Sequence, residues 1–315
     1  MTIAVITPAY QAESTLDAAL ASVAVQTLAP DEVVIADDGS TDRTADIARQ
    51  WEARLPVRVV RTGGNRGPAA ARAVAIAAST SDLIALLDAD DVFLADHLEL
   101  MRAAHATTDD GLASADTLRW IPGRTISDKP LSAMAPVPPR AQQLGWLLQA
   151  NHLSVASLFS RRRYDSVGGF RAEFHGTEDW DLWIRMVRSG AVVVRPDRPT
   201  LLYRLSQGNV SSEDRLVQAK IQVLDAAARE GGTDEQRAIN AGRRRLCAAA
   251  KLNDAYARAA AGASWSARVA GVKALRGTRR VAVRGAAMAV APRYVSRRRE
   301  ACRYDTDVWL QRYGS

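Results

Sequence analysis

Three carboxylates follow one short apolar run in the chain. Leu83–Leu87 lacks the 3.6-residue period of a helix, and Asp88, Asp90 and Asp91 come directly after it, a pattern typical of a strand buried on both faces of a parallel sheet. Like charges at this spacing repel each other and lose hydration, so they need a cation beside them. A hard divalent ion, Mg²⁺ or Mn²⁺, takes oxygen ligands and often arrives with substrate phosphates. The alternative is that Asp91 caps a helix starting near Phe93 and the other acids are solvated loop residues.

The surrounding sequence alternates between strand and helix patterns, which predicts βαβ units and a mostly parallel sheet. In open α/β sheets, ligands bind beyond the carboxyl ends of the strands, which is where the three carboxylates lie. The predicted strands are Ile3–Ile6, Glu32–Ala36, Val57–Arg61, the run before Asp88, Leu153–Phe159, Ala191–Arg195 and Thr200–Leu205. The predicted helices are Ser14–Val25, Arg43–Trp51, Ala69–Ala78 and one that begins at Glu178 and runs to Arg188. Residues 120–145 are rich in proline and predict a long connection.

Further polar groups follow these predicted strands and suit a nucleotide diphosphate. Tyr10 can stack on a base, and Asp38 can accept a hydrogen bond from a base N–H. Arg72, near the N-terminus of its helix, favours an anion. Asp88 and Asp90 can hold a metal that bridges phosphates. Taken singly, Tyr10 is equally explained as a packing residue, Asp38 as a turn former and Arg72 as a solvated helix charge.

Six motifs together resemble the family-2 glycosyltransferases of the GT-A fold, and the resemblance covers roughly residues 1–211. The motifs are Val5-Ile6-Thr7-Pro8-Ala9-Tyr10, Asp37-Asp38-Gly39-Ser40-Thr41-Asp42, Asn65-Arg66-Gly67 with Ala71-Arg72, Asp88-Ala89-Asp90-Asp91, Gly168-Gly169-Phe170 and Glu178-Asp179-Trp180-Asp181-Leu182-Trp183. The resemblance implies an inverting glycosyltransferase of hexosyltransferase type with a nucleotide-sugar donor, in the family commonly UDP-linked, and Mn²⁺ or Mg²⁺. The implied donor-binding residues are Pro8, Tyr10, Asp38, Asn65, Gly67, Arg72, Asp88 and Ala89, and the implied metal ligands are Asp90 and Asp88.

The resemblance also places Asp179 at the position of the family's catalytic base. Transfer of a sugar passes through an oxocarbenium-like transition state, and one carboxylate must take the proton of the attacking hydroxyl. Glu178 can raise the pKa of Asp179 by like-charge proximity, or orient the acceptor. Trp180 and His152 are predicted to contact the acceptor. The alternative is that the two acids are first-turn residues favoured by the helix dipole, and that Trp180 and His152 are structural.

One departure from the family concerns the metal. Many members place a histidine two residues after a Tyr-Arg pair, where it can approach the ion, and here Tyr203-Arg204-Leu205 is followed by Ser206. We therefore expect metal binding to depend on Asp90, the diphosphate and water. Position 9 is alanine and position 11 is glutamine, where Thr and Asn are common.

Charge divides the sequence into two regions. From residue 212 to the end there are 21 Lys and Arg against 10 Asp and Glu; of the 42 and 35 in the whole chain, 21 and 25 remain before it. The balances are +11 and −4, which predicts a catalytic domain over 1–211 and a basic, Ala/Arg-rich helical region over 212–315. Arginines and apolar residues between Trp265 and Arg299 suit amphipathic helices on an anionic membrane surface. The alternatives are a solvated helical face or an oligomer contact.

Composition excludes several other classes. Two cysteines and no Cys/His cluster argue against a disulfide scaffold or structural zinc. Sparse aromatic residues among the basic ones argue against a nucleic-acid partner. No apolar stretch is long enough to cross a bilayer, and no signal-peptide pattern opens the chain. We expect a cytoplasmic protein, or one held peripherally at the inner face of the cell membrane, that acts on a glycan or lipid-linked acceptor.

Two kinds of rival function, another nucleotide-handling enzyme and a non-catalytic binding protein, also suit an α/β sheet. A nucleotidyltransferase or a dinucleotide dehydrogenase also uses an α/β sheet, but each requires a Gly-rich phosphate loop after the first strand, and Thr7-Pro8-Ala9-Tyr10 contains none. A non-catalytic nucleotide-sugar-binding protein would keep the fold without turnover. The carboxylates at Asp88, Asp90 and Asp179 argue against that protein.

Overall fold

The computed structural model describes residues 1–120, 130, 136–205 and 213–260. These form two compact units, one with residues 1–147 and 151–205 and one with 148–150 and 213–260. The predicted boundary at residue 212 falls in the stretch 206–212, outside the described residues. The strands of the first unit are β1 (Ile3–Ala9), β2 (Glu32–Asp37), β3 (Val57–Arg61), β4 (Leu83–Leu86), β5 (Val92–Phe93), β6 (Gly111–Ser114), β7 (Thr117–Trp120), β8 (Ser157–Ser160), β9 (Val192–Val194) and β10 (Leu201–Arg204). Its α-helices are α1 (Leu16–Ala24), α2 (Thr44–Gln50), α3 (Pro68–Ala78), α4 (His97–His105), α5 (Arg140–Leu147), α6 (Arg161–Ser166) and α7 (Glu178–Arg188).

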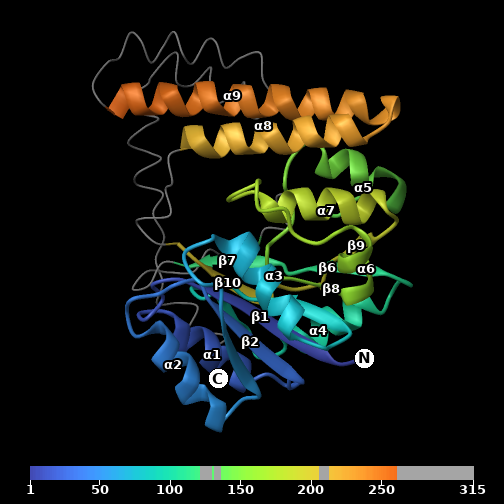
Figure 1. Ribbon diagram of the computed structural model, residues 1–315. Coiled ribbons are helices and arrows are strands. Elements are labelled where there is room, and N and C mark those ends of the chain that lie inside the picture. The colour runs from blue at the N-terminus through green and yellow to red at the C-terminus, as the bar shows by residue number, and fades with distance from the viewer. Residues whose placement is uncertain (121–129, 131–135, 206–212, 261–315) are drawn as a thin grey trace. The chain divides into compact units, whose positions relative to one another are not determined.

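A seven-stranded sheet in the order β3-β2-β1-β4-β8-β6-β9 forms the centre of this unit (Figure 1). The first four strands in this order are parallel, β8 is antiparallel to both of its neighbours, and β6 and β9 are parallel. The prediction of a mostly parallel α/β sheet is confirmed. The chain moves outward from β1 in one direction to β2 and β3, and in the other to β4. The carboxyl ends of β1 and β4 therefore flank a topological switch point, where open α/β sheets bind ligands.

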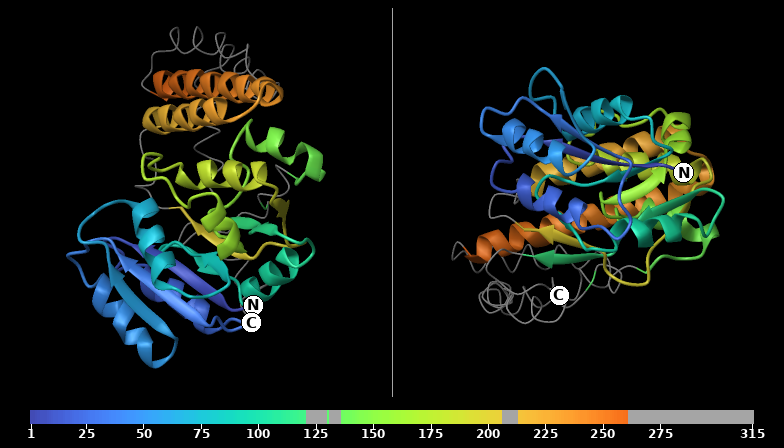
Figure 2. Two further views of the ribbon diagram at one scale, coloured as in Figure 1. Left: turned by 45° about the vertical axis from the view of Figure 1, so that its right-hand side comes forward. Right: turned by 90° about the horizontal axis from the view of Figure 1, so that it is seen from below.

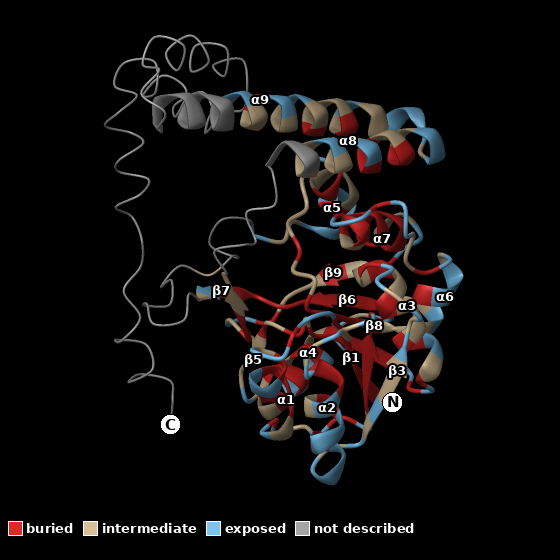
Figure 3. Ribbon diagram, turned by 60° about the vertical axis from the view of Figure 1, so that its left-hand side comes forward, coloured by how far each residue is buried: buried red, intermediate tan, exposed pale blue. Residues whose placement is uncertain are grey.

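Helices cover both faces of the sheet (Figures 1 and 3). On one face, side chains of α1, α2 and α4 pack against alternate strand residues, such as Val5, Ile35 and Leu158. Side chains of successive strand residues point to opposite faces, so Phe159 lies on the other face, where it contacts Trp183 of α7 edge-to-face with ring centroids 5.6 Å apart. Burial on both faces explains why the strand sequences are apolar runs without alternation.

The first strand extends further than predicted. β1 continues through Pro8 to Ala9, and Pro8 pairs with Ala36 of β2. The backbone of Ile6 accepts from the Leu87 N–H, so the edge that Ile6 shares with Pro8 faces β4. Pairing with β4 ends at Ile6, so the missing N–H of Pro8 faces a position where no strand follows. Proline is therefore accommodated inside a central strand, at the opening between β1 and β4.

Two local predictions are wrong, and a third is wrong at its end. The helix expected near Phe93 begins at His97, because Val92–Phe93 pairs with β10 in a separate sheet of order β5-β10-β7. The strand expected over 153–159 is shorter, Ser157–Ser160, because residues 151–156 form a loop toward α7. The connection over 120–145 ends in α5; most of its remainder lies outside the described residues.

The described residues of the second unit are mostly helical. Its described part is α8 (Glu213–Glu230) and α9 (Gln236–Ala260), joined by a 3₁₀ turn over Thr233–Glu235, and the two helices run side by side (Figure 2). Among the described helices, none combines the length and the apolarity that crossing a bilayer requires. The segment from Trp265 to Arg299, predicted to be amphipathic, lies outside the described residues.

Candidate active site

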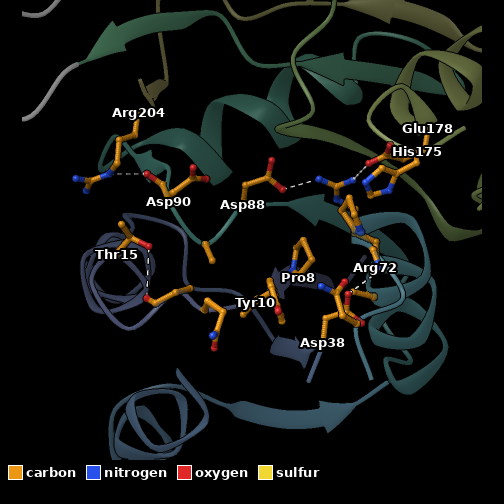
Figure 4. A pocket seen from close by; sticks show the side chains of 18 of the residues that line it. Pro8, Tyr10, Thr15, Asp38, Arg72, Asp88, Asp90, His175, Glu178 and Arg204 are labelled. Carbon is orange, nitrogen blue, oxygen red and sulfur yellow. Dashed lines mark hydrogen bonds and ion pairs between the residues drawn. The ribbon is translucent and has the colours of Figure 1, made fainter. Parts of the chain in front are cut away.

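A cleft of about 670 Å³ opens at the carboxyl ends of β1 and β4 (Figure 4). Every residue predicted to bind the donor or the metal lines it, and so does Glu178. The lining residues are Pro8, Ala9, Tyr10, Gln11, Ala12, Ser14, Thr15, Asp38, Asn65, Gly67, Pro68, Ala71, Arg72, Asp88, Ala89, Asp90, His175, Glu178 and Arg204. Residues from distant parts of the sequence therefore share one cavity, because parallel strands bring their following loops to the same edge.

At one end of the cleft, Asp38 is almost fully buried. Its carboxylate accepts hydrogen bonds from the Gly67 N–H (2.7 Å), the Arg66 N–H (3.0 Å) and the Thr62 hydroxyl (2.6 Å). Tyr10, by contrast, is 49% exposed, which leaves its ring available for stacking. Asp38 thus fixes the loop before α3, a structural task that the sequence alone did not predict for it.

Gly67 is the N-cap residue of α3, and its backbone conformation requires glycine. Its φ is 85° and its ψ 166°, a region that only glycine adopts without strain, and Pro68 occupies the first helical position. A Cβ at Gly67 would also lie 2.9 Å from Nδ1 of His175. Backbone N–H groups at a helix N-terminus favour an anion, and here they border the cleft.

The carboxylates of Asp88, Asp90 and Asp91 form a cluster at the carboxyl end of β4. One ligand oxygen from each lies within 4.8 Å of the others. Asp91 is 1% exposed, its Oδ1 accepts from the Arg204 N–H, and its Oδ2 has no hydrogen-bond partner among the described residues. Burial raises the pKa of Asp91 well above its ordinary value, and the charges of Asp88 and Asp90 add to this. An all-oxygen donor set with an unpaired buried oxygen fits a hard divalent cation such as Mn²⁺ or Mg²⁺.

Arg72 is buried, and its guanidinium joins two carboxylates. Nη2 donates to Asp88 Oδ1 at 2.6 Å, and Nη1 donates to Glu178 Oε1 at 2.7 Å. Burial by itself lowers the pKa of Arg72, but Asp88 and Glu178 outweigh that effect and raise it. The ring of Phe170 lies 5.7 Å from the guanidinium carbon. The predicted phosphate ligand is thus largely neutralised by protein carboxylates.

Glu178 and Asp179 occupy the first turn of α7 in different surroundings. Glu178 is 4% exposed, and its Oε2 has no hydrogen-bond partner among the described residues. Asp179 accepts from the Asn151 side-chain amide (2.9 Å) and from the Trp180 N–H, and it is not among the residues that line the cleft. Burial and then the charge of Glu178 raise the pKa of Asp179 to about 6, against a lowering by Arg72. A carboxylate with such a pKa is suited to accept a proton near neutral pH.

The structure does not support the two predicted acceptor contacts. Trp180 is 1% exposed, and its indole N–H donates to the Leu147 carbonyl at 2.8 Å. The ring therefore packs inside the protein, which corrects the prediction of a sugar platform. His152 stacks on Trp146 with ring centroids 4.5 Å apart, and it is not among the residues that line the cleft.

Three residues at the site have no role predicted from the sequence. Gln11 has a φ of 50°, and its side chain bonds Thr41 on the loop after β2. His175 faces Gly67, and Arg204 lines the cleft beside Asp90. From the sequence, the pair Tyr203-Arg204 served only to locate Ser206, which stands where many members of the family have a histidine. Pairing of the small sheet, which the sequence pattern did not reveal, is what brings Arg204 to the cleft.

Comparison with known proteins shows which family and which fold the chain is similar to. A family model described as glycosyl transferase family 2 matches residues 4–166, more than half of the chain. The uncharacterized glycosyltransferase YwdF of Bacillus subtilis is 25% identical over 240 residues, 75% of this chain and 86% of that protein. The UDP-Glc:alpha-D-GlcNAc-diphosphoundecaprenol beta-1,3-glucosyltransferase WfgD of Escherichia coli is 33% identical over 98 residues, but the match spans 31% of this chain and only 38% of WfgD.

Two solved structures share the fold. S. aureus TarS 1–349 has a TM-score of 0.64 at 18% identity, covering 96% of this chain and 92% of that one, and TarS complexes with UDP and UDP-GlcNAc also match. The mannosyltransferase PcManGT from Pyrobaculum calidifontis, in complex with GDP-Man and Mn²⁺, has a TM-score of 0.63 at 21% identity, covering 95% of this chain and 84% of that one. The switch-point cleft, the matched family model and the shared fold together identify this chain as a member of glycosyl transferase family 2 with the GT-A fold.

Proposed function

We propose that this glycosyltransferase moves a sugar, with inversion, from a UDP-sugar to a hydroxyl of a glycan or lipid-linked acceptor. The observation that carries the proposal is the cleft that holds Tyr10 and Asp38 at one end and the carboxylates of Asp88 and Asp90 at the other. A nucleotide-sugar carries its base at one end and its diphosphate farther along, and the cleft offers a stacking ring with a carboxylate at one end and a site for a cation at the other.

In the proposed reaction, Asp179 accepts the proton of the acceptor hydroxyl as its oxygen attacks the anomeric carbon. The bond from that carbon to the diphosphate oxygen breaks, and the diphosphate keeps the electron pair. One displacement on the face opposite the leaving group inverts the anomeric configuration. The raised pKa of Asp179, about 6, supports this assignment. Glu178 holds the Arg72 guanidinium and adds the neighbouring charge that raises that pKa.

We assign the metal to Asp88 and Asp90, with the buried Asp91 beside them. A bound Mn²⁺ or Mg²⁺ would neutralise charge on the departing diphosphate. The geometry of the three carboxylates and the unpaired Asp91 oxygen support a cation there. PcManGT, of the same fold, was solved with Mn²⁺.

The donor base and the acceptor class are assigned from relatives. TarS was solved with UDP and UDP-GlcNAc, and the name of WfgD specifies UDP-Glc and a diphosphoundecaprenol-linked acceptor. PcManGT, with GDP-Man, shows that the same fold also takes guanine. We therefore propose uridine as the base and a lipid-linked or glycan hydroxyl as the acceptor.

Thermal unfolding with a panel of nucleotide-sugars tests the proposal. A ligand that binds the native state raises its stability in proportion to how far its concentration exceeds its Kd. UDP-sugars with MnCl₂ should raise the Tm, EDTA should reverse the rise, and nucleoside diphosphate should be released when a hydroxyl acceptor is added. Release of nucleoside diphosphate by the wild-type protein but not by Asp179→Asn would identify a transferase. A rise in Tm without any release would identify a non-catalytic binding protein.

We also propose that the basic region after residue 212 binds the anionic inner face of the cell membrane, which would suit a lipid-linked acceptor. Its charge balance of +11 supports this. Co-sedimentation with phosphatidylglycerol vesicles should exceed that with phosphatidylcholine vesicles. Replacing Arg297, Arg298 and Arg299 with Gln should reduce co-sedimentation with phosphatidylglycerol vesicles. Equal co-sedimentation of the wild type and this variant would contradict membrane binding by the basic region.

A further inference from the structure

We propose that Arg204 binds the diphosphate of the donor and stabilises its charge as it leaves. This inference depends on the proposed nucleotide-diphosphate-sugar donor. It assigns to Arg204 the electrostatic role that the sequence predicted for Arg72.

The pairing of the small sheet places Arg204 at the acid cluster. β10 is antiparallel to β5, with Leu202 opposite Val92, and continuing this register brings Arg204 opposite Asp90. β10 is also parallel to β7, with Arg204 paired to Trp120. The residue is therefore positioned between Asp90 and Trp120 by backbone pairing that does not depend on its own side chain.

Three contacts then fix Arg204. Its backbone N–H donates to Asp91 Oδ1 at 2.9 Å, its Nε donates to the Asp90 carbonyl at 2.8 Å, and its guanidinium carbon lies 4.2 Å from the centre of the Trp120 ring. Stacking on an aromatic face holds the planar guanidinium in one orientation. The side chain is half-buried and lines the cleft next to Asp90 (Figure 4).

The two terminal nitrogens of Arg204 remain unused. Among the described residues, neither Nη1 nor Nη2 has a hydrogen-bond partner, and Arg204 has no ion pair with a carboxylate side chain. In Arg72, both terminal nitrogens donate to carboxylates, and the side chain is 4% exposed. Both ends of the Arg72 fork are therefore occupied by carboxylates, whereas the Arg204 fork keeps two free ends, although its charge also acts on the neighbouring Asp91.

A phosphate group is the ligand that suits such a fork. Guanidinium and phosphate form paired, charge-assisted hydrogen bonds of matching geometry. A cation held by Asp88 and Asp90 would supply further positive charge to the same diphosphate. When the sugar leaves, negative charge grows on that diphosphate, and a fixed cation beside it lowers the barrier.

Calorimetric titration with UDP and with UMP, each with MnCl₂, tests this role. Arg204→Gln should weaken UDP binding about 10- to 100-fold, because charged hydrogen bonds to phosphate are lost, and should weaken UMP binding much less. The UDP affinity of Arg204→Lys should lie between those of the wild type and Arg204→Gln, since lysine keeps the charge but lacks the planar fork. Trp120→Leu should also weaken UDP selectively, because the guanidinium loses its stacking surface.

Arg119→Gln is the matched control. Arg119 precedes Trp120 on β7, is exposed and does not line the cleft, so its loss should leave both titrations unchanged. Equal UDP affinity in wild type and Arg204→Gln, with native unfolding curves, would overturn the role of Arg204 while leaving the proposed function intact. Absence of UDP and GDP binding to wild type would overturn the proposed function and this inference together.

Discussion

Arg72 Nη1 lies 2.7 Å from Glu178 Oε1, across 106 positions of sequence. The same guanidinium donates to Asp88 at 2.6 Å. One buried cation therefore connects the strand end that carries the acid cluster with the helix that carries the proposed base. Movement or loss of the Arg72 side chain would therefore disturb both the acid cluster and the start of α7.

Arg72→Leu should destabilise the fold by about 3–5 kcal/mol, because removing one partner leaves a buried charge uncompensated. Adding Glu178→Gln should recover part of the loss, since the unpaired carboxylate is then neutral. Urea unfolding of the single and double variants measures both effects. Arg49→Leu, which breaks an exposed ion pair with Asp46, should cost only about 0–1 kcal/mol. An Arg72→Leu loss as small as that of Arg49→Leu would contradict a structural role for the bridge.

The pH dependence of transfer should follow Asp179. A general base works when ionised, and the pKa of Asp179 is raised to about 6, so kcat/KM should rise with pH through about 6 and level off above it. Glu178 raises that pKa by its charge. Glu178→Gln should therefore move the midpoint to lower pH, whatever it does to the maximal rate. A midpoint that stays fixed or moves upward would show that another group controls the profile.

Asp90→Ala should remove most of the metal dependence of donor binding. With UDP as titrant, wild type should bind at least about 10-fold more tightly with MnCl₂ than with EDTA, judged from the effect of perturbing metal sites. The variant should bind equally under both conditions, at the affinity of wild type in EDTA. Asp46→Ala, an exposed carboxylate on α2, is the control and should behave as wild type. A variant that kept the MnCl₂ effect would place the ion elsewhere.

Gly67→Ala should cost about 1–3 kcal/mol of stability through its backbone conformation, plus a contact with His175. Gly63 has a similar φ of 82°, but a Cβ there meets nothing within 4 Å. Gly63→Ala should therefore be milder. Removing the ring with His175→Ala should recover only the contact part of the Gly67→Ala loss. The four variants are Gly67→Ala, Gly63→Ala, His175→Ala and the double variant Gly67→Ala/His175→Ala. Thermal unfolding of these variants separates backbone strain from the contact with His175. Full recovery of stability in the double variant would show that backbone strain is unimportant.

The sequence by itself determined most strands of the large sheet, their order along the chain and the acids at their ends. Those features follow from local patterns: apolar runs such as Leu83–Leu87 form buried strands, and polar residues directly after them must lie at the edge of the sheet. Sequence motifs also located many of the residues that line the cleft, among them Pro8, Asp38 and Glu178.

Only the tertiary structure decided which side chains pair. Arg72 is neutralised by Asp88 and Glu178, Trp180 is buried, and Arg204 reaches Asp90 through the pairing of β5 with β10. Partners so distant in sequence leave no periodic signal, because strand pairing and helix packing bring them together after the local elements have formed. Whether a charged side chain such as Arg72 can bind a ligand depends on the buried groups around it. Those groups become its neighbours only in the folded chain.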